Sequence, residues 1–302
     1  MQKNEISWFR ESLKNLRKYS QSRLQKSISE IEKILNNIEK LTEKFKASLK
    51  KTEKKIIKNR ETLKGRFYNS PVKSDQSKGI PNPPLEKEYD SDSEIIELPQ
   101  PDKSILKKTN IYDCIRERFS RRKFTNEDLS LEELSFLLWS TQGIKKLVAD
   151  GKVSLRTVPS AGARHPFETY LGINRVTGLK KGVYRYLPVE HKLVFLFTDK
   201  KFEKKINTAV FLQSFVGDSA VVFIWSTIPY RTEWRYPLTG HKVILLDAGH
   251  ICQNLYLSAE AIKCGTCAIA AYDQKKMDKL LKLDGKNEFV IYLAPVGKLK
   301  FS

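Results

Sequence analysis

A nearly uninterrupted apolar run at residues 220–228 constrains the fold of this chain more than any other segment. It is rich in β-branched and aromatic residues, and its length suits a strand. A strand that is apolar at every position has to be covered on both faces, so the run predicts a central strand buried within the fold. A similar run at residues 289–295 predicts a second buried strand near the end of the chain.

Strand and helix patterns alternate around these two runs. Strands are predicted at residues 168–173, 182–187 and 192–197. A short helix is predicted at residues 112–119 and a long helix at residues 242–262. Ser130 and Glu133 form a capping-box pattern that predicts the start of a further helix at residues 131–141. The mixture of elements predicts an α+β or mixed α/β sheet covered by helices.

The first 58 residues have a different pattern. Residues 24–56 lack Gly and Pro, and their apolar and Thr residues recur alternately four and three positions apart, which is the heptad seam of a coiled coil. Residues 1–58 also carry 16 of the 55 basic residues against 7 of the 35 acidic ones, a net +9 of the total +20. Two interpretations follow: a basic arm that binds nucleic acid or acidic lipid, or a self-associating helix with solvated lysines. We favour the second, because no nucleic-acid motif occurs.

Residues 65–101 are rich in Pro, Ser and Asp and cannot continue a helix. A long unstructured loop is unusual inside a compact domain, so we expect an extended arm laid over the following domain. We therefore expect a coiled-coil helix at 1–58, the arm at 59–104 and the main domain at 105–302. The apolar side chains expected to hold the arm in place are Ile80, Leu85, Ile95, Ile96 and Leu98.

The cysteine count and the apolar runs bear on location. Four cysteines are too few for a disulfide scaffold in 302 residues, which favours a reducing cytoplasm. No apolar run approaches the roughly 20 residues that span a bilayer. The polar stretch from Met1 to Arg10 is unlike a signal peptide. We expect a cytoplasmic protein without a membrane partner.

Several common catalytic motifs are missing from the sequence. There is no G-x-G-x-x-G, Walker loop, H-E-x-x-H or G-x-S-x-G, which removes the usual sequence evidence for a Rossmann site, an ATPase, a zinc protease or a serine hydrolase. Cys264 and Cys267 form an isolated C-x-x-C, which we interpret as a small-residue turn. The four histidines show no ligand spacing, so we expect no metal site.

Two other segments carry the residue types of a binding site. Residues 159–166 begin and end with proline, and Gly162 with its small neighbours leaves room for a flat, bulky ligand. An ordinary tight loop is the alternative. Arg118 and Arg122 flank Ser120, and together they offer the bidentate donors and the hydroxyl that a phosphate requires.

Four motifs taken together resemble the flavin-dependent nitroreductase family, and more narrowly its SagB-type dehydrogenase branch. The resemblance covers about residues 59–298. It implies an α+β fold with a central, mostly antiparallel sheet flanked by helices, and an intertwined homodimer with two FMN molecules at the interface. The motifs are RFSRR at 118–122, PSAGARHPFE at 159–168, DAGHICQNL at 247–255 and CAIAAYD at 267–273.

The resemblance also implies roles for individual residues. Arg118 and Ser120 would hold the FMN phosphate and ribityl chain, and Lys298 is a further phosphate candidate. Arg122 would lie near the pyrimidine edge, where a fixed positive charge stabilises the reduced flavin. The residues expected around the flavin ring are Pro159, Ser160, Ala161 and Gly162 from the other subunit, and Ile269, Ala270 and Ala271 near N5.

The family implies an oxidoreductase that takes hydride from NAD(P)H in a ping-pong reaction and reduces a small acceptor such as a nitroaromatic or a quinone. The alternative is the oxidation of peptide azolines to azoles. Some relatives use a Lys-Tyr pair for that reaction, and Arg235 and Tyr236 occupy the matching place. Tyr236 would then handle the proton, with Arg235 as an electrostatic aid, because arginine is a poor base. A third possibility is a basic coiled-coil scaffold or a nucleic-acid-associated protein with a non-catalytic flavin domain, although we do not favour a nucleic-acid partner.

Overall fold

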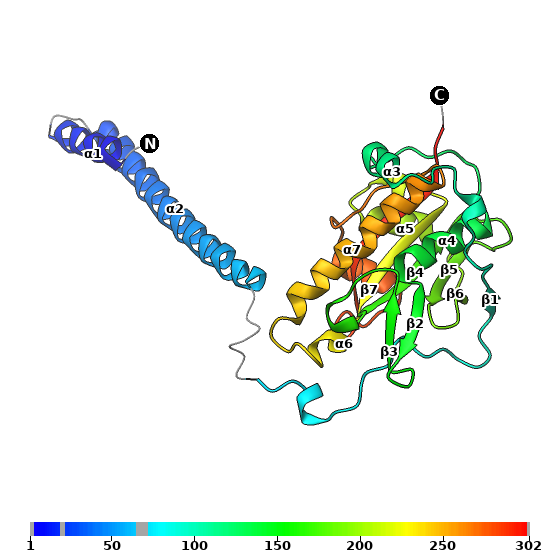
Figure 1. Ribbon diagram of the computed structural model, residues 1–302. Helices are drawn as coiled ribbons and strands as arrows, with labels where there is room; N and C mark the ends of the chain where they lie inside the picture. Colours follow the sequence, from blue (N-terminus) through cyan, green and yellow to red (C-terminus); the bar gives the residue numbers. More distant parts are fainter. Residues whose placement is uncertain (1–2, 19–21, 65–71, 301–302) are drawn as a thin grey trace. The chain divides into compact units, whose positions relative to one another are not determined.

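The structure is a computed structural model that describes residues 3–18, 22–64 and 72–300 (Figure 1). The chain divides into two compact units, Met1–Lys64 and Gly65–Ser302. Within the described ranges, no helix has an apolar stretch long enough to cross a bilayer.

The first unit consists of two helices, α1 (Lys3–Arg17) and α2 (Ser22–Arg60). Arg10 pairs with Glu39 at 2.6 Å and Arg17 with Glu32 at 3.0 Å, so α1 lies antiparallel to the first half of α2. The long helix predicted over residues 24–56 is confirmed, but part of its seam is already covered by α1, which the sequence analysis did not predict. Buried in this contact are Leu13, Ile28 and Leu35.

The second unit is built on a seven-stranded sheet in which every neighbouring pair of strands is antiparallel, in the order β1-β6-β5-β4-β7-β9-β8. The predicted central strand is confirmed: β7 lies between β4 and β9. The α+β fold with a mostly antiparallel sheet is confirmed as well. The strands are β1 (Ile95–Glu97), β4 (Phe167–Ile173), β5 (Gly182–Leu187), β6 (Lys192–Phe197), β7 (Val221–Thr227), β8 (Cys264–Thr266) and β9 (Phe289–Lys298).

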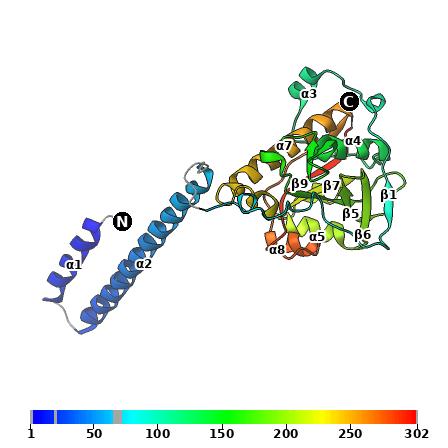
Figure 2. The same ribbon diagram turned by 60° about the horizontal axis from the view of Figure 1, so that its bottom comes forward.

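Helices cover both faces of the sheet (Figure 2). Alternate residues of β7 divide between two cores, as the period of two of a strand requires. Val221, Phe223 and Trp225 pack with α4 (Leu131–Gln142) and α7 (Gly240–Ala261). Val222 and Ile224 pack with α5 (Phe202–Ala209) and α8 (Gln274–Leu280).

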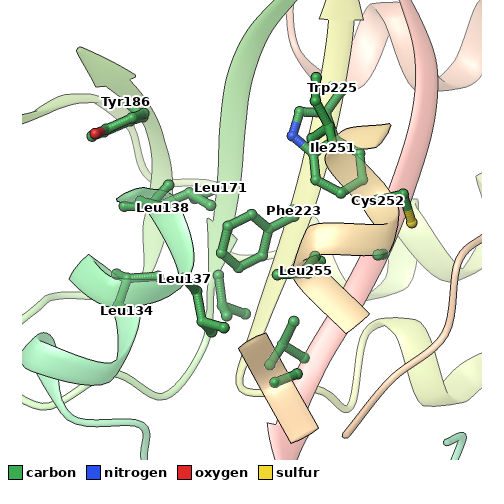
Figure 3. Packing of buried hydrophobic residues seen from close by; sticks show 14 of the residues in the cluster. Leu134, Leu137, Leu138, Leu171, Tyr186, Phe223, Trp225, Ile251, Cys252 and Leu255 are labelled. Atoms are coloured by element: carbon green, nitrogen blue, oxygen red, sulfur yellow. The ribbon is translucent and has the colours of Figure 1, made fainter. Parts of the chain in front are cut away.

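The larger core lies between the sheet and the helices α4 and α7 (Figure 3). Phe223 lies between Leu137 of α4 and Leu255 of α7, and all three side chains are fully buried. The capping box predicted at the start of α4 is present: the Ser130 hydroxyl accepts from the Glu133 amide, and the Glu133 carboxylate accepts from the Ser130 amide.

Two short segments differ from expectation. Residues 142–158, for which no element was predicted, contain the hairpin β2 (Ile144–Val148) and β3 (Val153–Arg156). The expected turn at the C-x-x-C contains the edge strand β8, and all four cysteines are free and buried. Both segments are short and lack a continuous apolar pattern, so periodicity gave no strand signal.

The described part of the arm in the second unit, residues 72–104, lies on the main domain. Its strand β1 extends the sheet beside β6, and Leu98 is buried in the larger core. The prediction that Ile80 holds the arm by its side chain is wrong, because that side chain is 44% exposed. Its carbonyl does so instead, accepting a hydrogen bond of 2.9 Å from Trp234 Nε1.

Candidate functional site

The segment from Arg118 to Arg122 lies along the edge strand β8. It follows the helix α3 (Ile111–Glu117), and Ser120 pairs with Thr266 of β8 as a parallel bridge. The Arg121 amide donates to the Thr266 carbonyl at 2.8 Å. The neighbouring Gly265 allows this approach, since a Cβ there would come within 2.7 Å of Arg121 Cβ.

Tyr256 of α7 connects this segment to the next motif. Its hydroxyl lies 2.9 Å from Ser120 Oγ and accepts a hydrogen bond of 2.8 Å from the Ala268 amide. The Arg118 guanidinium stands over its ring at 5.3 Å. Tyr256 falls within the helix predicted at residues 242–262, but no role was predicted for it. The sequence feature that could have indicated this role is the hydroxyl group of Tyr256, which stands among apolar side chains on that helix.

Arg118 and Arg122 carry charges that no carboxylate neutralises among the described residues. Arg122 stands over the Phe215 ring at 6.0 Å. By contrast, Arg116 pairs with both Asp113 and Glu117 at 3.0 Å. The two predicted phosphate-binding arginines are therefore available to an anion.

Lys298 is differently placed. Its ammonium pairs with the carboxylate of Glu133, the capping residue of α4. A phosphate could use Lys298 only if this ion pair were shared or broken.

Two of the four backbone amides in the segment 268–271 are open. Ile269 is buried, and its amide donates to the Leu293 carbonyl at 2.8 Å, so that amide is already used. Ala270 and Ala271 are exposed, and their amides bond to none of the residues that the structure describes. Two of the three residues predicted near flavin N5 thus keep free donors.

Asp247 of α7 anchors the loop at 159–166. Its carboxylate accepts from Ser160 Oγ at 2.6 Å and from the Ala161 amide at 3.2 Å. Ser160 Oγ in turn accepts from the His165 amide at 2.9 Å. Burial raises the pKa of Asp247, and these donors oppose that rise.

The loop backbone is strained. Gly162, Ala163 and His165 have φ values of 61°, 53° and 45°, a left-handed conformation that is costly for residues other than glycine.

The imidazole of His165 in this loop is neutral at ordinary pH. Burial, and then the charge of Arg156, lowers its pKa to about 2, so it cannot act as an acid.

Arg235 and Tyr236, the predicted catalytic pair, lie next to Gly162 of the loop. A Cβ added there would lie 2.7 Å from the Tyr236 hydroxyl and 2.9 Å from Arg235 Cδ, so a side chain at this position would have to displace them. The Arg235 guanidinium stands 5.5 Å from the centre of the Tyr236 ring. Burial, followed by the charge of Arg235, lowers the pKa of the nearby Arg164 to about 10. The structure thus brings together two motifs that lie 73 residues apart in the sequence.

Trp234, which the sequence analysis did not assign, holds this pair in position. Arg164 stacks on its indole at 4.6 Å and donates through Nε to the Arg231 carbonyl at 2.7 Å. The Trp234 carbonyl accepts from the Gln76 amide of the arm at 3.0 Å. The arm and the loop therefore fix the backbone directly before Arg235.

Replacing Asp247 by alanine should loosen the loop. The change leaves the Ser160 hydroxyl and the Ala161 amide without their acceptor, which is expected to lower the free energy of unfolding by about 1–3 kcal/mol. Urea denaturation measures the loss. Asp247→Asn keeps one acceptor oxygen and should lose less than half as much. An alanine variant as stable as the wild-type protein would show that the carboxylate does not anchor the loop.

A seven-stranded antiparallel sheet with helices on both faces and an arginine-serine-arginine segment beside its edge strand is a nitroreductase-type α+β fold. A putative nitroreductase structure from Ralstonia eutropha shares it, with a TM-score of 0.57 and 22% identity over 71% of this chain and 93% of that one. The model of the nitroreductase family matches residues 115–298.

Curated relatives agree with this assignment. A putative nitroreductase of Methanocaldococcus jannaschii is 30% identical over 67% of this chain and 96% of its own length. The trifolitoxin-processing protein TfxB of Rhizobium leguminosarum bv. trifolii is 27% identical over 52% of this chain and 44% of that protein. The chain belongs to the nitroreductase family, a family of oxidoreductases that generally use a flavin and NAD(P)H and are generally dimeric.

Proposed function

We propose that this protein is an FMN-dependent oxidoreductase that takes hydride from NAD(P)H and reduces a small acceptor such as a quinone or a nitroaromatic. The observation that carries the proposal is that the chain has two arginines without a carboxylate partner, Arg118 and Arg122, and two open amides, at Ala270 and Ala271, among its described residues.

These residues fit the chemistry of FMN. Arg118 and Ser120 offer charged and hydroxyl donors to its phosphate and ribityl chain. Arg122 offers a fixed positive charge to the pyrimidine edge, and the two alanine amides offer donors near N5. Bound FMN would supply a centre that accepts and donates two electrons as hydride. The chain's own residues bind the group, orient it and set the charge around it.

A homodimer would complete the site. Asp247, which anchors the loop, and Tyr256, which contacts Ser120, are nine residues apart on α7, so they point to opposite sides of the helix about 14 Å apart. One chain therefore carries two separate half-sites, and a partner related by two-fold symmetry would place its loop against this chain's arginines. The exposed apolar side chains Ile111, Ile115, Leu245 and Leu246 on α3 and α7 support such an interface.

The placement of Arg235 and Tyr236 favours a second candidate, the oxidation of peptide azolines to azoles. Tyr236 presents its hydroxyl beside the loop at Gly162, where it could take or give a proton. Arg235 would stay charged and stabilise negative charge in the substrate. The relative TfxB is, by its name, a toxin-processing protein, which is consistent with a peptide substrate.

The two functions can be separated with one variant. The full chain, loaded with FMN and desalted, should oxidise NADPH or NADH with menadione as acceptor. Tyr236→Phe should change that rate by less than about threefold, but should slow oxidation of a thiazoline peptide about 100-fold, a typical effect of losing a proton-transfer group. Retained peptide oxidation in this variant argues against a proton-handling role. If the loaded wild-type protein turns over neither substrate, the oxidoreductase proposal is wrong.

A further inference from the structure

A cavity lined by lysines lies on the α5 and α8 side of the sheet. Its volume is about 620 Å³, within the usual range for small-molecule pockets. The wall is formed by α5, α8, the loop before α5 and the end of β6. Six of its lining residues are lysines: Lys201, Lys204, Lys205, Lys276, Lys279 and Lys282.

The positive charge of this cavity is largely uncompensated. Asp199 is the one acidic residue of its lining, and it pairs with Lys205. Lys276 pairs with Asp273 at 3.4 Å. Among the residues that the structure describes, Lys201, Lys204 and Lys279 have no carboxylate partner. Lysines held so close together repel one another, and an anion with several charges relieves that repulsion.

The lining also has an apolar part. Phe197 and Leu280 form an apolar wall, and the Lys282 ammonium stands 4.1 Å from the centre of the Phe197 ring. The hydroxyls of Thr198 and Thr208 add hydrogen-bonding groups. Lysines beside an aromatic face suit a ligand that combines phosphates with a flat ring.

We propose that this cavity binds the phosphate groups of a nucleotide. The volume of about 620 Å³ suits a small molecule rather than a nucleic-acid strand or an acidic peptide. The Asp273 amide donates to the Ala209 carbonyl at 2.7 Å. The helix α8, whose Lys276 and Lys279 line the cavity, begins three residues after Ala271. If the proposed function holds, the nucleotide could be the reduced dinucleotide that donates hydride, which would extend from this cavity toward the candidate flavin site. The other ligand that would bring phosphate groups to the cavity is a separate nucleotide effector.

Calorimetric titration of the full chain with ADP at low ionic strength tests the proposal directly. Lys204→Glu/Lys279→Glu should weaken ADP binding about tenfold or more. Lys181→Glu/Lys286→Glu makes the same change in net charge at exposed lysines outside the cavity and should weaken it less than about twofold. Equal weakening in both double variants would overturn the proposal, and so would a polyglutamate peptide that binds more tightly than ADP and displaces it.

The KM values for NADPH and NADH identify the source of the nucleotide. A rise of about tenfold in KM at unchanged kcat in the cavity variant assigns the cavity to the electron donor, whereas unchanged KM with weakened ADP binding assigns it to a separate nucleotide. The ADP measurement needs neither flavin nor turnover. Specific ADP binding without turnover therefore overturns the proposed function alone, and turnover without specific ADP binding overturns the cavity proposal alone.

Discussion

Glu168→Gln should lower the free energy of unfolding by about 3–5 kcal/mol, because two buried arginines would lose their negative partner. The Glu168 carboxylate lies 2.6 Å from Arg231 and 3.3 Å from Arg185, and all three side chains are at most 4% exposed. Its Oε1 also accepts from the Lys87 amide at 2.9 Å. The single carboxylate thus joins β4, β5, the arm and the helix α6 (Tyr230–Glu233).

Urea denaturation followed by circular dichroism measures this loss. Glu190→Gln is the matched control, since Glu190 pairs with Lys192 at 3.1 Å on the surface, where an ion pair contributes about 0–1 kcal/mol. Equal losses in the two variants would contradict the central role of Glu168. If Glu168→Gln does not fold, Arg185→Met tests the same network from the other side and should also be strongly destabilised.

Arg118→Ala/Arg122→Ala should weaken FMN binding by about 100-fold or more. A hydrogen bond to a charged group contributes about 1.5–3 kcal/mol, so two lost arginines account for that factor. Quenching of FMN fluorescence during titration of the protein measures the dissociation constant, and retained absorption near the flavin bands after desalting provides a second readout.

Arg116→Ala is the control for this experiment, since Arg116 lies on the same short segment but is neutralised by Asp113 and Glu117. It should retain FMN within about twofold. If the double variant binds FMN with the same affinity as Arg116→Ala, the cofactor binds elsewhere, and the proposed role of Arg118 and Arg122 is wrong.

The main domain was largely predictable from sequence because its signals are strong and local. The run at 220–228 and the strands at 182–187 and 192–197 are apolar enough to fix their own boundaries within a residue. The antiparallel order of the sheet came from the family resemblance, since pairing of distant strands is not a local property.

What the sequence did not reveal depends on contacts between distant segments. The role of Trp234 requires the arm and the loop to meet it, and that of Tyr256 requires two edge segments to approach α7. The return of α1 along α2 was missed because a heptad seam does not say whether its partner belongs to the same chain. The approach of Gly162 to Tyr236 likewise follows from tertiary structure alone.

The arm has a practical consequence for anyone who shortens this protein. A fragment that starts at residue 105 would match the family model in full, yet it would leave the edge of β6 unpaired and open to aggregation. It would also deprive Trp234 Nε1 and Glu168 of bonds that they make to the arm. The smallest fragment that retains these contacts and the bond from the Gln76 amide to the Trp234 carbonyl begins at or before Gln76, about forty residues upstream of the family match.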